Sequence, residues 1–213
     1  MNSEETAPLL APDGSAFDLS GGRLCLDFVN TVDGRLREPR DRLGRYADLV
    51  SWAEQAGAIE AAQALALREE ASQRPQDAQR ALAAARALRE ALFAILSSSA
   101  RGESPPADAV AELNDALPGA LSALRLAAAG HAFEWRWSLA ERGLDRAVAP
   151  VIRDAAELLT SADLARVTEC ESESCAWLFL DQSRNRSRRW CDMSVCGNRA
   201  KARRHYRRTK RAT

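Results

Sequence analysis

Apolar residues recur every three or four positions over most of the first 160 residues, which is the pattern of amphipathic helices that bury one face. Five segments share this pattern: residues 43–59, 60–73, 76–99, 107–117 and 144–159. Pro75 separates the second helix from the third, because proline interrupts a helix from within. Pro150 lies inside the last segment, where we expect it to kink the helix. The pattern therefore predicts a multihelical domain.

Between the last two of these helices the period changes from that of a helix to that of a strand. Two runs of alternating apolar positions appear there: Leu124, Leu126 and Ala128, then Phe133, Trp135 and Trp137. Gly130 lies in the short connection between them, so the segment predicts a β-hairpin. The compact apolar segment at residues 24–31 fits either a short strand or a buried helix, because periodicity cannot separate the two at this length.

These patterns predict three parts of the chain. Residues 1–20 are rich in proline, glycine, serine and acidic residues, and we expect a flexible lead-in there. Residues 21–160 are expected to form a mainly α domain with a small β-hairpin (α+β), and residues 161–213 a separate C-terminal module. No apolar run approaches the ~20 residues of a membrane helix, and the first residues lack the pattern of a signal peptide. We therefore expect a cytoplasmic protein with no membrane partner.

The net charge of the 213-residue chain is zero, because 30 Lys and Arg residues balance 30 Asp and Glu residues. The positive and negative charges are, however, unevenly distributed along the chain. Residues 166–213 contain 13 Lys and Arg against 5 Asp and Glu, a net charge of +8, and the first 165 residues carry −8. Such a split is typical of a basic module joined to an acidic one. The basic module becomes a candidate for nucleic-acid binding, which the net charge of the whole chain would argue against.

Four of the five cysteines lie in this basic module: Cys170, Cys175, Cys191 and Cys196. Their spacing, C-x4-C-x15-C-x4-C, supplies two short chelating pairs of the kind that bind one structural Zn²⁺ through four thiolates. Unconnected thiols and disulfides are weaker readings, since cytosolic thiols stay reduced. So small a module buries too little apolar surface to fold alone, and metal binding would contribute the missing free energy.

The residues between the cysteines fit a treble-clef-like finger. Residues 176–180 predict a strand with Trp177 and Phe179 on one face and Leu178 and Leu180 on the other. A polar, basic return loop follows at residues 181–189. Cys196 is followed directly by a helix-compatible run, which would place the fourth ligand at the start of a helix. Backbone amides at that start would then ease the negative charge of a thiolate.

Two groups of motifs resemble known families. Residues 196–199 read Cys-Gly-Asn-Arg, after a Trp-Cys pair at residues 190–191 and a Phe-Leu-Asp-x-Ser run at residues 179–183, and these resemble the CGNR zinc finger. Leu-Asp-Phe-Val-Asn-Thr at residues 26–31 and Asp-Leu-Val-Ser-Trp at residues 48–52 resemble the ABATE domain that usually precedes this finger. The resemblance implies a bacterial, stress-responsive transcription regulator, in which the ABATE domain senses a ligand and the finger binds DNA.

The C-terminal run after Cys196 carries the densest positive charge. Basic residues of the return loop and of this run are the candidate nucleic-acid contacts: Arg184, Arg186, Arg188, Arg189, Arg199, Lys201, Arg203, Arg204, Arg207 and Arg208. Twelve Lys and Arg within residues 184–211 face the single acid Asp192, which is the electrostatic pattern of phosphate binding. The alternatives are a solvated tail or a surface that docks on the acidic domain. The other stripe of the helix, Asn198, Ala202, His205 and Tyr206, is expected to pack on the finger.

The N-terminal domain offers a candidate ligand pocket at Asp27, Asn30, Thr31 and Trp52. Buried polar groups need partners. A small-molecule effector is one such partner, although caps and backbone amides are the favoured ones, and the tryptophan fits a core. Cys25 fits a small buried apolar residue. The sequence shows no Ser/His/Asp set, P-loop or H-E-x-x-H motif, so we expect no enzyme activity.

The first hypothesis is therefore a DNA-binding transcription regulator with a zinc finger and an effector-sensing domain. Two alternatives stay open: a protein-interaction adaptor whose finger docks an acidic partner, and a thiol-redox sensor that loses zinc when its thiolates oxidise. A homodimer would suit a regulator that reads paired half-sites. No heptad seam in the sequence indicates where such a dimer would form.

Overall fold

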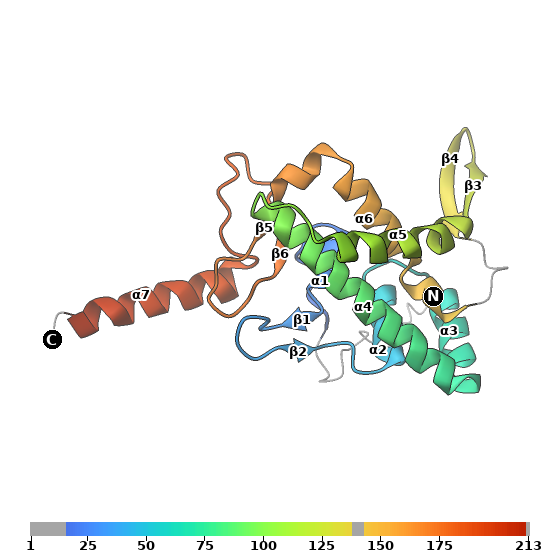
Figure 1. Cartoon of the computed structure of the whole chain (residues 1–213), viewed down its shortest axis with the longest axis horizontal. Helices are drawn as coiled ribbons and strands as arrows, with labels where there is room; N and C mark the ends of the chain where they lie inside the picture. The colour runs from blue at the N-terminus through green and yellow to red at the C-terminus, as the bar shows by residue number, and fades with distance from the viewer. Residues whose placement is uncertain (1–15, 138–142, 212–213) are drawn as a thin grey trace, which may run out of the picture.

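Helices dominate the computed structural model, which describes residues 16–137 and 143–211 (Figure 1). Its α-helices are α1 Leu24–Val29, α2 Tyr46–Gln55, α3 Ala61–Gln73, α4 Pro75–Ala100, α5 Ala107–Ser122, α6 Ala149–Leu159 and α7 Asn198–Arg211. These bounds confirm the mainly α class, and they settle the ambiguous segment at residues 24–31 as a helix. Most of the predicted lead-in lies outside the described residues.

The strands form three antiparallel pairs rather than one larger sheet in the described part of the chain. The pairs are β1 Val32–Asp33 with β2 Arg40–Asp41, β3 Leu124–Ala129 with β4 Ala132–Trp137, and β5 Val167–Glu169 with β6 Leu178–Leu180. The predicted hairpin is β3–β4, and its register places Leu126 opposite Trp135. Among the described helices, none is both long and apolar enough to cross a membrane.

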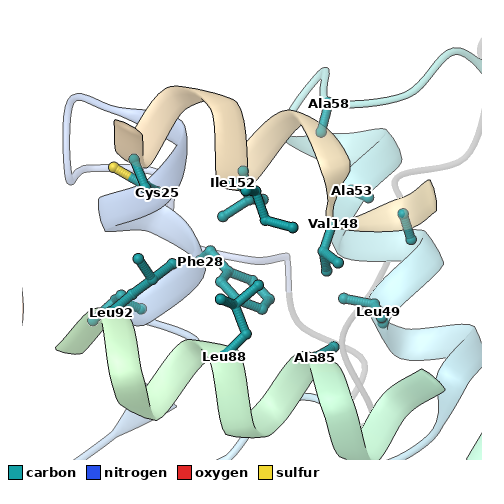
Figure 2. Packing of buried hydrophobic residues seen from close by; sticks show 14 of the residues in the cluster. Cys25, Phe28, Leu49, Ala53, Ala58, Ala85, Leu88, Leu92, Val148 and Ile152 are labelled. Atoms are coloured by element: carbon teal, nitrogen blue, oxygen red, sulfur yellow. The ribbon is translucent and has the colours of Figure 1, made fainter. Parts of the chain in front are cut away.

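The main core surrounds α1, whose six residues are too few to form a helix without tertiary packing. Phe28 of α1 is fully buried, and its ring lies 5.0 Å from that of Trp52 on α2. Figure 2 shows Leu88 and Leu92 of α4 on one side of Phe28 and Ile152 of α6 on the other. The apolar stripe of α4 therefore closes over α1, as its helical period predicts.

Two prolines behave differently from a simple helix breaker. Pro150 does not kink a helix, so that prediction was wrong: residues Leu144–Ala147 form a 3₁₀ turn, and Pro150 lies in the first turn of α6. A proline is tolerated there because the first N–H groups of a helix have no internal partner. Helix α5 also continues past Pro118 and ends at Ser122, five residues beyond the predicted end.

Strand β6 joins the C-terminal module to the helical domain. Leu178 and Leu180 belong to the main core, whereas Phe179 between them lies in a second apolar cluster with the four cysteines. Trp177 packs on the same side as Phe179. The predicted alternation of residues 177–180 is thus confirmed, and each face of this short strand is covered by a different core.

Groups from the helical domain also satisfy the backbone of β6. The Asn30 side chain donates to the Leu178 carbonyl over 2.8 Å and accepts from the Leu178 N–H over 2.9 Å. The Leu180 N–H donates to the carbonyl of Gly21 over 2.8 Å. Trp177 adds a hydrogen bond from its indole N–H to the Val32 carbonyl over 2.9 Å. The side-chain amide of Asn30 and the carbonyl of Gly21 thus bond to the edge of β6 that β5 does not cover.

Asn30→Asp tests this junction. The carboxylate cannot donate to the Leu178 carbonyl, and it would place a charge beside that oxygen at a site only 4% exposed. We expect the free energy of unfolding of the zinc-loaded protein to fall by about 2–4 kcal/mol. Denaturant titration measures it. The same substitution at the exposed Asn114 of α5 is the control and should change stability by less than about 0.5 kcal/mol. Equal effects of the two variants would contradict the role of Asn30.

Candidate metal centre

The four C-terminal cysteines converge on one point. Their sulfur atoms all lie within 4.8 Å of one another, and all four residues are buried. The sulfur of Cys191 lies 3.6 Å from that of Cys175 and 3.7 Å from that of Cys196. Four sulfurs placed tetrahedrally at ~2.3 Å from a zinc ion are separated by about 3.8 Å. The four cysteines are therefore positioned to bind one metal ion, with the ligand set and spacing of a structural zinc site.

Two chelating turns present these sulfurs. Cys170 follows β5 and Cys175 precedes β6, and the turn between them is closed where the Cys170 N–H donates to the Trp177 carbonyl over 2.8 Å. Ala176 takes a left-handed φ of 61° as the chain leaves the turn. Cys196 lies in the π-helical turn Met193–Gly197 that runs directly into α7. The fourth ligand thus lies at the start of a helix, the arrangement expected for a treble-clef-like finger.

Four sulfurs this close need a cation to balance their charge if all are to be thiolates. Hydrogen bonds from Cys175 and Cys191 lower the pKa of Cys170. The hydrogen bond with Cys170 correspondingly raises the pKa of Cys175, and contacts with both of these cysteines raise the pKa of Cys191. Protons are thus shared within the cluster when only thiols are present. A divalent cation removes this competition, because it favours the thiolate at every ligand.

Two aspartates shape the loops around the centre, and the sequence analysis did not single them out. The N–H groups of Ser183 and Arg188 donate to the buried Asp181 over 2.8 and 3.0 Å and fold the return loop. Burial alone would raise the pKa of Asp181, but hydrogen bonds from Ser183 and Arg188 outweigh burial and lower this pKa. Asp192 likewise accepts from the N–H groups of Ser194 and Val195 and caps the π-helical turn. Both occur as Asp-x-Ser, a pattern typical of Asx turns that could have identified them.

Several of the predicted nucleic-acid contacts also make contacts within the finger. The guanidinium of Arg188 lies 4.3 Å from the ring centre of Phe179 and donates to the carbonyls of Trp190 and Cys191. Arg189 forms an ion pair with Glu171, and Arg203 lies 3.9 Å from Glu173. These arginines stabilise the metal-binding loops and contribute less free charge than their number suggests.

The remaining basic candidates form two exposed groups. Arg184 and Arg186 lie on the return loop, and Arg199, Lys201 and Arg204 lie on α7. Arg207 and Arg208 continue the same helix, with side chains outside the described set. Three residues of the second stripe of α7 do not pack on the finger, so that prediction was wrong for them: Tyr206 is 67% exposed, and Asn198 and Ala202 are exposed too. The side chain of His205 lies outside the described set. The helix projects from the body and contacts mainly the π-helical turn before it (Figure 1).

The structure gives most polar groups of the candidate pocket partners within the protein. Asp27 accepts from the Gly21 N–H over 2.8 Å, and the Asn30 amide is used by β6. The Thr31 hydroxyl donates to the Phe28 carbonyl over 2.7 Å and accepts from the buried Arg89 over 3.1 Å. Trp52 is a fully buried core residue. Three of the four residues therefore stabilise α1 and its contacts, and ligand binding by them stays a prediction.

The raised pKa of Asp27 predicts how the stability of the protein depends on pH. Burial raises its pKa from 3.8 to about 7; the Gly21 N–H opposes this shift, and the charges of Asp18 and Asp154 add to it. The folded state thus keeps a proton that the unfolded state loses at a lower pH. This contribution to stability is complete below about pH 4 and is lost as the pH rises through about 7.

We expect Asp27→Asn to remove this loss and to be more stable than the parent at pH 8, by about 2–4 kcal/mol. The amide oxygen still accepts from Gly21, and no charge forms as the pH rises. Denaturant titrations of both proteins between pH 5 and pH 8 measure the difference. The exposed Asp115→Asn is the control. A difference from the parent that does not change with pH would contradict the raised pKa.

Cys191→Ser should release the zinc ion and loosen the finger, because three thiolates and a hydroxyl bind zinc far more weakly than four thiolates. Native mass spectrometry measures the zinc content. Cys25→Ala is the matched control: Cys25 is a free thiol buried in the main core, away from the four-sulfur cluster. The control should retain one zinc ion per chain. Full zinc retention in Cys191→Ser would remove Cys191 from the ligand set.

Two family models match the chain, one over the helical domain and one over the finger. The ABATE model, described as "Putative stress-induced transcription regulator", matches residues 22–162, and the CGNR zinc finger model matches residues 166–209. No curated protein matches the sequence. The second match includes all four sulfur ligands and most of α7. The chain therefore belongs to the ABATE family and carries a CGNR zinc finger after its ABATE domain.

Proposed function

We propose that this chain regulates transcription by binding DNA through the zinc finger, with α7 as the main contact, and that its N-terminal domain senses a small-molecule effector in the cytoplasm. The observation that carries the proposal is α7 itself. Eight of its 14 residues are Lys or Arg, none is acidic, and the helix projects from the zinc centre into solvent (Figure 1).

The electrostatics of α7 favour a polyanionic partner. Arg199, Lys201 and Arg204 are exposed, and none of them forms an ion pair with an acidic side chain of the described residues. The eight cations repel one another, and those in the first turn also oppose the helix dipole. Phosphates placed along the helix would relieve both effects. Such contacts supply affinity and salt dependence, whereas sequence choice needs contacts to base edges.

The return loop supplies a second group of cations. Arg184 and Arg186 are exposed, while the buried Asp181 holds the loop that carries them. The metal centre connects this loop to α7, because Cys191 follows the loop and Cys196 precedes the helix. Zinc therefore orders two basic segments at once. We propose a structural role for the ion and no catalytic one.

The junction at β6 provides a physical route from an effector to the finger. A ligand that shifts α1 would move Asn30, which makes two hydrogen bonds to Leu178 next to the metal cluster. The redox alternative has less support, since the four cysteine residues are only 3–8% exposed. Effector identity and the direction of regulation would follow from binding experiments with candidate metabolites.

The test is selection of genomic fragments by the zinc-loaded full chain, followed by affinity measurements on the enriched duplex. We expect enrichment of specific sequences and strong salt dependence. Lys201→Ala/Arg204→Ala should weaken binding and lower the slope of log affinity against log salt by about 1.8, which corresponds to two phosphate contacts. Electrophoretic mobility or fluorescence anisotropy at several salt concentrations gives the slope.

Arg74→Ala/Arg80→Ala, which changes the residue before α4 and a residue on it, is the control with the same change in charge, and it should leave the slope unchanged. A slope that is equally insensitive to both double variants would remove α7 from the interface. Failure to enrich or retain any duplex at moderate salt would favour the adaptor, in which α7 docks an acidic protein surface.

A further inference from the structure

The β3–β4 hairpin exposes an apolar surface at the end of the molecule opposite α7 (Figure 1). Leu126, Phe133 and Trp135 share one face of the hairpin and are 58%, 71% and 54% exposed. Taking about 150–250 Å² for a whole side chain of this size, the three expose roughly 400 Å² of apolar surface. A contiguous patch of this size on a monomer is typical of an interaction site.

The outer edge of β4 has no paired strand in the described part of the chain, where β4 pairs with β3 alone. Gly130, with φ at 63°, begins a two-residue turn that pairs Ala129 with Ala132. Ladder hydrogen bonds in an antiparallel pair alternate from such a turn. The N–H and C=O groups of Phe133, Trp135 and Trp137 are therefore directed toward the free edge of β4.

The sequence of β4 complements itself when two copies run antiparallel. If Trp135 lies opposite Trp135 of the second copy, Glu134 lies opposite Arg136 of that copy, and Arg136 opposite its Glu134. On the apolar face, Phe133 then meets Trp137 of the second copy. Cross-strand pairs of opposite charge and of aromatic residues stabilise such an arrangement. Strand β3 offers no comparable match, because Arg125 is its one charged residue.

From these features we propose that two copies of the chain associate through β4, forming a four-stranded sheet with a two-fold axis at Trp135. The two-fold axis makes every contact occur twice, as expected of an isologous interface. It requires no residue of the metal centre or of α7, so it is independent of the proposed DNA contacts.

The surroundings of β4 leave room for this neighbour. A groove of about 430 Å³ lies between Glu134–Trp137 and the segment that connects α2 to α3, where Gly57 and Glu60 line it. Within one chain Glu134 and Arg136 pair with each other at 2.6 Å on the polar face, and both are solvent-exposed. Exchanging these two exposed pairs, one in each copy, for two pairs across the axis costs little. The interface is at the small end for stable complexes, so a micromolar dissociation constant is expected.

Sedimentation equilibrium of the zinc-loaded full chain between about 1 and 200 µM tests the proposal. We expect reversible association of the 23.3 kDa chain into a dimer. Trp135→Glu should abolish it, because two carboxylates would meet at the axis. Leu65→Glu on α3 changes an equally exposed leucine elsewhere and should leave the dimer intact. A chain that stays monomeric at the highest concentration would overturn the proposal, whatever else covers the hairpin.

Charge exchange identifies the register. Glu134→Arg alone and Arg136→Glu alone each place like charges opposite each other twice, and each should raise the dissociation constant about tenfold. A mixture of the two variants restores both opposite-charge pairs, so it should form a heterodimer of near-parental affinity. Dissociation constants that neither substitution changes, or a mixture that does not associate, would overturn the β4 pairing. The DNA affinity of the monomeric Trp135→Glu protein is measured separately on short duplexes. It distinguishes a failure of the β4 pairing from a failure of the proposed function.

Discussion

The structure depends on one short strand that two different cores must cover. All three residues of β6 are apolar and buried, so both of its faces require packing partners. The main core, with α1 in contact with β6, covers the side of Leu178 and Leu180, and the cysteine cluster covers the side of Phe179. Neither cover is sufficient alone, since the finger is too small to fold without metal and its strand is incomplete without Asn30. The helical domain and the finger therefore share packing and hydrogen bonds at β6, although separate family models match them.

Features set by local periodicity could be predicted from the sequence. The long helix α4, the β3–β4 hairpin, the four sulfur ligands and the alternation in residues 177–180 all follow from spacing along a short stretch. Predictions failed where distant or competing contacts decide. Asn30 and Leu178 are 148 positions apart, and nothing in the sequence near either residue indicates the pair. Pro150 was misplaced because a helical stripe also runs through the 3₁₀ turn before α6. The second stripe of α7 was assigned to the finger from the positions of its residues around the helix axis. Those positions do not show how little of the finger lies beside the helix.

The division of charge between the two parts of the chain becomes more specific in the structure. Counting residues gives a uniformly basic module, but its cations have different roles. Arg188 is stacked inside the finger, Arg166 donates to the Asp181 carbonyl, and Arg189 is paired with Glu171. The free positive charge is concentrated on α7 and at the tip of the return loop. Local geometry, set by zinc and two aspartates, therefore converts a diffuse excess of arginine into an oriented basic surface.

The hairpin and α7 lie at opposite ends of the longest axis of the molecule (Figure 1). A duplex held along α7 leaves the apolar face of the hairpin uncovered and out of its reach. If DNA binds along α7 as proposed, it does not compete for surface with the proposed β4 interface. The helical domain then acts as a spacer of fixed length, which sets how far a bound protein is held from the DNA.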